Sequence, residues 1–134
     1  MKLAKPDQHL ILADIISKEP LGPAVRQGDD QWLNIVKVGA TRHVNDEKLG
    51  VSSRTIDGAL QSTSPDVRRL LGIERKFGEQ LGLANNWVAN LIKLVDNYGE
   101  VYDRNVGVDS RLAIPRGLNE LWTMGGLQYA PPLR

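Results

Sequence analysis

The fold class of this chain is decided by one stretch, Asn86 to Gly107, which reads NWVANLIKLVDNYGEVYDRNVG. Its apolar and aromatic side chains keep the i, i+3, i+4, i+7 spacing of one helical face. They are Trp87, Leu91, Leu94, Val95, Tyr98, Val101 and Tyr102. Val88 and Ile92 widen the stripe, so the pattern predicts a buried helix of about five turns, bent at Gly99 and closing near Gly107.

More helices are expected on both sides of this stretch. Asp29 or Asp30 can cap a helix that closes at Gly50. One face of this helix is expected to be buried, with Trp32, Ile35, Val36, Gly39, Ala40 and Val44 on it. Start and stop residues predict further helices over residues 52–60, 64–72, 74–81 and 115–125, followed by an extended tail.

The N-terminal region has a different pattern. Residues 9–16 are apolar and β-branched, which predicts a strand. Leu21 to Arg26 predicts a second extended piece, which Pro20 and Pro23 place at a sheet edge or in a crossing segment. The expected fold class is therefore mainly α: one helical domain, residues 1–134, with one or two short N-terminal strands.

Composition limits the functional classes. The 134 residues are 41% hydrophobic and 25% charged, which is typical of one globular domain. A net charge of +1 gives no strong field for nucleic acid or an anionic membrane. Cysteine is absent, and His9 and His43 are too few for a zinc site. Pro6, Asp7 and Gln8 follow the basic start and do not fit a secretory signal, so the chain expressed as written is expected in the cytoplasm.

No motif predicts catalysis, since a P-loop, a dinucleotide fingerprint and a nucleophile elbow are all absent. The Asp29-Asp30 pair is interpreted as a helix cap rather than a metal or acid–base pair. Asp96, Glu100 and Arg104 are spaced as a solvated charge ladder. His43 is interpreted as a surface or partly packed residue. We expect no enzyme, no cofactor, no catalytic residue and no metal ligand.

The densest basic patch could mimic a helix-turn-helix. It comprises Arg68, Arg69, Arg75 and Lys76, and nearby acidic residues dilute its charge. Nucleic-acid binding is therefore only a third hypothesis. Four aromatic residues lack the interleaved basic residues of a stacking platform and are interpreted as packing residues. They are Trp87, Tyr98, Tyr102 and Trp122.

Several strings, in order along nearly the whole chain, carry a family resemblance. They are Ile15 to Trp32, Arg68 to Gly72, Asn97 to Glu100, Arg104 to Gly107, Gly117 to Trp122 and Gly125 to Pro132. Together they resemble the C-terminal portion of general L-amino-acid-binding periplasmic proteins, which are family 3 solute-binding proteins of amino-acid ABC transporters.

The resemblance implies a partial lobe of a type II periplasmic-binding-protein-like fold. Family members have two α/β lobes with the ligand between them. Residues 9–26 resemble the second crossover, and residues 28–134 resemble the closing helices and C-terminal extension of the first lobe. The residues that clamp the amino acid lie upstream in the family, so ligand-binding residues of this chain stay unassigned. Residues 38–43 depart from the family, which has Trp and large apolar residues there.

The expected function is a truncated amino-acid-binding component of an ABC importer, unable to bind solute alone. The resemblance implies L-amino acids and the transporter's membrane subunits as partners, and a periplasmic location. The alternative is a stand-alone helical interaction module. In the family, the second lobe and half of the first lobe's sheet cover the surfaces of residues 9–38. Without them, an unpaired strand edge and an apolar surface would be exposed, which predicts a homodimer through that region. The residues left uncovered would be Leu10, Leu12, Ile15, Ile16, Trp32, Ile35 and Val36.

Overall fold

The computed structural model describes residues 5, 8–10, 12, 14, 22–74 and 76–132. Its helices are α1 (Asp30–Lys48), α2 (Ile56–Ala59), α3 (Pro65–Leu70), α4 (Phe77–Gln80), α5 (Trp87–Val95), α6 (Tyr98–Asn105) and the 3-10 turns η2 (Gly117–Asn119) and η3 (Trp122–Met124). The described residues contain no strand beyond one isolated bridge between Leu121 and Gln128. The prediction of a mainly helical chain is therefore confirmed.

Only part of the N-terminal region with the two predicted strands is described. Residues 22–26 have no regular secondary structure, so the second extended piece forms no strand there. Most of the predicted strand over residues 9–16 lies outside the described residues.

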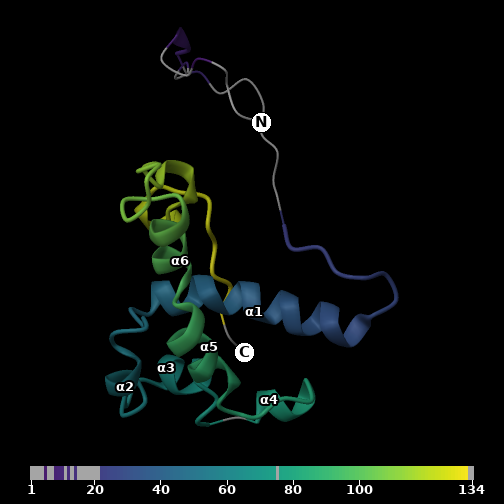
Figure 1. Ribbon diagram of the computed structural model, residues 1–134. Helices are drawn as coiled ribbons and strands as arrows, with labels where there is room; N and C mark the ends of the chain where they lie inside the picture. The colour runs from purple at the N-terminus through teal and green to yellow at the C-terminus, as the bar shows by residue number, and fades with distance from the viewer. Residues whose placement is uncertain are drawn as a thin grey trace.

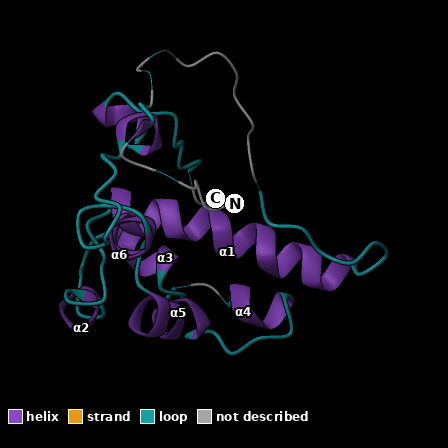
Figure 2. Ribbon diagram, turned by 45° about the horizontal axis from the view of Figure 1, so that its top comes forward, coloured by secondary structure: helices purple, strands orange, loops and turns teal. Residues whose placement is uncertain are grey.

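Helix α1 runs through the middle of the molecule and contacts α3, α5 and α6. Both views place α2 to α5 on one side of α1 and the C-terminal segment with η2 and η3 on the other (Figures 1 and 2). Helix α6 passes the C-terminal end of α1, where Gly99 lies against the side chain of Glu47. The two sides of α1 therefore face two different cores.

The larger core lies on the α3–α5 side and is fully apolar. Its buried members are Val51, Ile56, Val67, Leu70, Leu71, Val88, Ala89 and Ile92. The smaller core comprises Val44, Leu121 and Ala130, with Tyr98 packed against it. This second core fixes the C-terminal segment to α1 and α6.

The ends of α1 form as the sequence predicts. The Asp29 side chain accepts a hydrogen bond from the Trp32 backbone N–H at 3.0 Å, which confirms the cap. Gly50 has a φ of +70° just after the helix, where a side chain would be strained. The loop after it returns to the larger core through the Val51 N–H, which donates to the Asp46 carbonyl at 2.8 Å.

The predicted buried face of α1 is wrong for its first half. Trp32 is 51% exposed, and Ile35 and Val36 are only half-buried. The fully buried side chains of α1 are instead in its second half: Arg42, Val44, Asn45 and Asp46. The first half of α1 stays exposed because only the second half of the helix lies between the two cores.

The single long helix predicted over residues 86–107 is also wrong. It is two helices, and the break lies at Asp96 and Asn97 rather than at Gly99. Asp96 adopts a positive φ of 74°, and Asn97 starts α6 with a capping box. The Asn97 Oδ1 accepts from the Glu100 N–H at 2.9 Å, and the Glu100 carboxylate accepts from the Asn97 N–H at 3.1 Å.

The last predicted helix, residues 115–125, is replaced by the two 3-10 turns. Gly117 has a φ of +48°, which a regular α-helix does not contain. A Cβ on Gly126 would lie 1.9 Å from the Glu120 carbonyl oxygen, so the chain folds back tightly there. The predicted helices over residues 52–60, 64–72 and 74–81 are present in shortened form as α2, α3 and α4.

Candidate functional site

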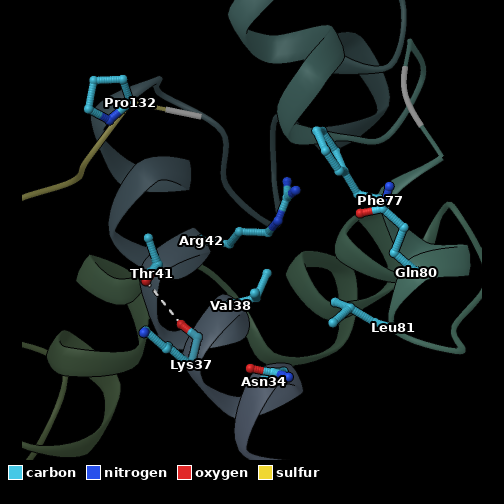
Figure 3. A pocket seen from close by; sticks show the side chains of 9 residues that line it. All are labelled: Asn34, Lys37, Val38, Thr41, Arg42, Phe77, Gln80, Leu81 and Pro132. Atoms are coloured by element: carbon cyan, nitrogen blue, oxygen red, sulfur yellow. Dashed lines mark hydrogen bonds between the residues drawn. The ribbon is translucent and has the colours of Figure 1, made fainter. Parts of the chain in front are cut away.

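A groove with a volume of about 410 Å³ lies beside the middle of α1. It is lined by Asn34, Lys37, Val38, Thr41, Arg42, Phe77, Gln80, Leu81 and Pro132. Figure 3 shows Arg42 in the middle, with the α4 side chains at one edge and Pro132 of the tail at the other. Three separate chain segments therefore form this groove.

Arg42 is the central polar residue of the groove and is only 4% exposed. Its guanidinium lies over two aromatic rings, 5.8 Å from the centroid of Phe77 and 6.0 Å from that of Trp87. Its Nη1 donates a hydrogen bond to the Leu70 carbonyl, while its Nε is buried without an acceptor. Burial lowers the pKa of Arg42, and nearby Asp46 only partly opposes this.

Asp46, one turn further along α1, is fully buried. Neither carboxyl oxygen has a hydrogen-bond partner. Burial raises the pKa of Asp46 to about 8, although the charge of Arg42 opposes the shift. A carboxyl with this pKa is mostly protonated at neutral pH. Sequence analysis missed Arg42 and Asp46, although the departure of residues 38–43 from the family pattern marks this part of the helix.

A second polar cluster holds the C-terminal segment against α1. Arg116 forms a two-pronged ion pair with Glu47, and its Nη2 lies 3.0 Å from the Glu47 Oε2. The Arg116 guanidinium also lies over the rings of Tyr98 and Tyr102, at 5.4 and 5.8 Å. Both Nη atoms of Arg116 are paired with Glu47 or a backbone carbonyl, and only its buried Nε has no acceptor, so the main role of this cluster is structural.

The predicted charge ladder of Asp96, Glu100 and Arg104 forms only in part. Arg104 pairs with Asp96 across the helix break, whereas Glu100 turns away from both. Its carboxylate accepts hydrogen bonds from the N–H and the hydroxyl of Ser53, both at 3.0 Å. Burial alone would raise the pKa of Glu100, but these bonds and the one from Asn97 outweigh it and lower the pKa.

The other polar candidates have structural roles. Arg68 pairs with Glu74 at 2.8 Å, Arg69 with Asp66 at 3.7 Å and Lys76 with Glu79 at 3.4 Å, while Arg75 lies outside the described residues. His43 is half-buried, which agrees with its interpretation as a surface or partly packed residue. Its Nδ1 is buried without a partner, and burial lowers its pKa.

Of the four aromatic candidates, three pack as interpreted. Trp87 packs against the larger core, Tyr98 against the smaller one, and the Tyr102 hydroxyl donates to the Pro115 carbonyl at 3.2 Å. Trp122 differs, since it is 55% exposed and contacts only Tyr129 among the aromatic rings, at 5.9 Å between centroids. No two of these rings form a stacking platform for bases.

The groove presents groups of the kinds that bind ligands. Within the described ranges, no group of three His, Cys, Asp or Glu side chains could hold a metal ion. None of the described helices has the length and apolarity needed to cross a lipid bilayer. The groove offers one buried cation, exposed amides and apolar walls.

Comparison with known proteins shows that this chain is similar to periplasmic solute-binding proteins. No protein-family profile matches the chain. The general L-amino acid-binding periplasmic protein AapJ of Rhizobium johnstonii is 54% identical over the whole chain, which covers 40% of that relative. The putative amino-acid ABC transporter-binding protein YhdW of Escherichia coli is 47% identical with the same coverage.

Two further comparisons agree with these relatives. The glutamate/glutamine/aspartate/asparagine-binding protein BztA of Rhodobacter capsulatus is 44% identical over 93% of the chain and 37% of that relative. A solved ABC transporter periplasmic binding protein from Brucella ovis, with glutathione bound, superposes with a TM-score of 0.91. It is 47% identical, and the match covers 98% of this chain and 42% of the other.

Along its whole length, the chain is therefore similar to amino-acid-binding periplasmic proteins of ABC transporters. It spans about 40% of the length of the curated relatives that it matches. The family resemblance found in the sequence is confirmed.

Proposed function

We propose that this chain is the C-terminal part of an amino-acid-binding component of an ABC importer, that it works in the periplasm, and that it has no catalytic activity. The observation that supports the proposal is identity of up to 54% along the whole chain with relatives named for amino-acid binding. We further propose that residues 1–134 fold as one domain, which is a partial lobe of the two-lobed protein. In this proposal, only the complete protein binds the transporter's membrane subunits.

We also propose that the isolated chain does not bind an amino acid in the manner of its relatives. The family ligand lies between two lobes, whereas this chain covers 40% of the first relative's length. With one lobe only, the ammonium and carboxylate of a bound amino acid would be exposed to water, where each ion pair contributes little to binding.

Calorimetry with a panel of L-amino acids tests this proposal. We expect no saturable heat from the isolated chain, because the groups that clamp the ligand's ammonium and carboxylate are upstream in the family. A longer chain that adds the upstream part of a relative such as AapJ is the matched control and should bind. Micromolar binding by the isolated 134-residue chain would contradict the proposal.

The alternative function, a helical interaction module, is supported by the apolar face of the first half of α1. Trp32 is 51% exposed and Leu33 is 46% exposed, and Ile35 and Val36 are half-buried beside them. Exposed apolar patches of this kind mark interaction surfaces. We propose that a second copy of the chain covers this face, in a homodimer joined through residues 9–38.

Light scattering at micromolar concentration tests the homodimer. We expect a mass of twice the 14.8 kDa of one chain, because burying an apolar face of each copy is favourable. Trp32→Asp should return the chain to a monomer. Leu94→Glu is the control, since Leu94 is 83% exposed on α5 and lies outside the proposed interface. A monomeric wild-type chain, or equal effects of both substitutions, would contradict the proposal.

A further inference from the structure

The groove beside α1 has a one-sided charge pattern. Among the described residues, its lining includes two cationic side chains, Lys37 and Arg42, and no carboxylate. Among the described residues, Lys37 has no ion-pair partner. The groove is therefore positively charged along one side.

Arg42 has unused hydrogen-bonding capacity at the floor of this groove. A guanidinium carries five N–H donors, and here one hydrogen bond is made, from Nη1 to the Leu70 carbonyl. The buried Nε has no acceptor. Asp46, the nearest acid on α1, forms no ion pair with Arg42 within 4.0 Å and no hydrogen bond. A buried guanidinium without an ionised partner favours an anion beside it.

The remaining walls suit a ligand with an apolar body. Val38, Leu81 and Pro132 contribute aliphatic surface from α1, the end of α4 and the tail. Asn34 and Gln80 contribute exposed amides at the rim (Figure 3). A volume of about 410 Å³ lies within the range of small-molecule sites.

We propose that this groove binds a small organic carboxylate, with the carboxylate at Arg42 and Lys37 and the apolar body against Val38, Leu81 and Pro132. Binding at this groove does not depend on the proposed function. Within residues 9–38, the groove uses Asn34, Lys37 and Val38, whereas the proposed dimer face centres on Trp32 and Val36. At 3.6 residues per turn, Asn34, Lys37 and Thr41 lie on the side of α1 opposite Trp32 and Val36.

Titration of the ¹⁵N-labelled chain with sodium hexanoate, followed by backbone amide chemical shifts, tests the site. We expect saturable shifts at Lys37, Val38, Thr41 and Gln80 in the millimolar range. Hexanamide, which has the same chain without the charge, should bind at least about tenfold more weakly, because charge-assisted hydrogen bonds are the stronger ones. Equal binding of hexanoate and hexanamide, or no saturable shift, would overturn the proposal.

Matched variants separate this site from general attraction of anions. Lys37→Gln should weaken hexanoate binding by about three- to tenfold, as expected for a lost exposed cation at a binding site. Lys48→Gln, at the exposed end of the same helix, should leave it unchanged. The double substitution Arg42→Met with Asp46→Leu should abolish binding in a folded chain. Equal losses from Lys37→Gln and Lys48→Gln, or full binding by the double variant, would overturn the assignment.

Discussion

Replacing Arg42 by Met and Asp46 by Leu in the same chain is expected to raise the free energy of unfolding by about 1–4 kcal/mol, the gain typical of exchanging a buried polar pair for apolar residues. Both side chains are almost fully buried between the α1 helix and the larger core. Three of their polar atoms, the Arg42 Nε and both Asp46 carboxyl oxygens, have no partner. Each such atom costs desolvation energy without a compensating hydrogen bond.

Denaturant unfolding, followed by circular dichroism, measures this effect. The control replaces an exposed ion pair, Asp57→Leu with Lys93→Met, whose Nζ and Oδ1 are 2.6 Å apart on the surface. Because exposed ion pairs contribute little, that double variant should change the unfolding free energy by no more than about 0.5 kcal/mol. A loss of stability in the Arg42/Asp46 variant would show that the buried polar pair supports the fold.

One member of this buried pair, Arg42, lies in a stretch where the chain departs from the family pattern. The resemblance implies large apolar residues after Lys37, where this chain has Val38 to His43. The helix nevertheless continues without a break from Asp30 to Lys48. Polar residues thus occupy helical positions that face a core, and the unpartnered atoms of Arg42 and His43 are the consequence.

Helix ends in this chain were predictable because capping residues act locally. Asp29 and Gly50 mark both ends of α1, and Pro65 marks the first turn of α3. The break between α5 and α6 carried a local signal too, the capping box Asn97-x-x-Glu100. The continuous apolar stripe concealed it, because α5 and α6 both present apolar residues at helical spacing and the spacing alone does not show a change of direction.

Burial was harder to predict than helix boundaries, because it depends on which segments lie against each face. The apolar residues around Trp32 indicated an inward face, yet the described chain provides nothing to cover them. Arg42 and Asp46 appeared suited to solvent and became buried, because the α3–α5 segment packs against the second half of α1. The groove depends in the same way on α4 and on Pro132, which are distant in sequence.

The second large effect is a loss of stability between pH 6.5 and pH 8. Burial raises the pKa of Asp46 from 3.8 to about 8 in the folded chain. The unfolded chain therefore releases this proton at a lower pH than the folded chain does. The stability linked to Asp46 is fully present below about pH 4 and falls as the pH rises to about 8, by at most about 1.4 kcal/mol per pH unit.

His43 acts with the opposite sign, which sets the window for the measurement. Burial lowers its pKa below 6.5, so its contribution is present above pH 6.5 and is lost as the pH falls. Above pH 6.5 only the Asp46 effect changes strongly, and unfolding free energies at pH 6.5 and pH 8 should differ by up to about 2 kcal/mol. Asp46→Asn, which keeps the shape but cannot ionise, should abolish most of this difference. An equal slope in both proteins would show that Asp46 is ionised, and therefore solvated, in the folded chain.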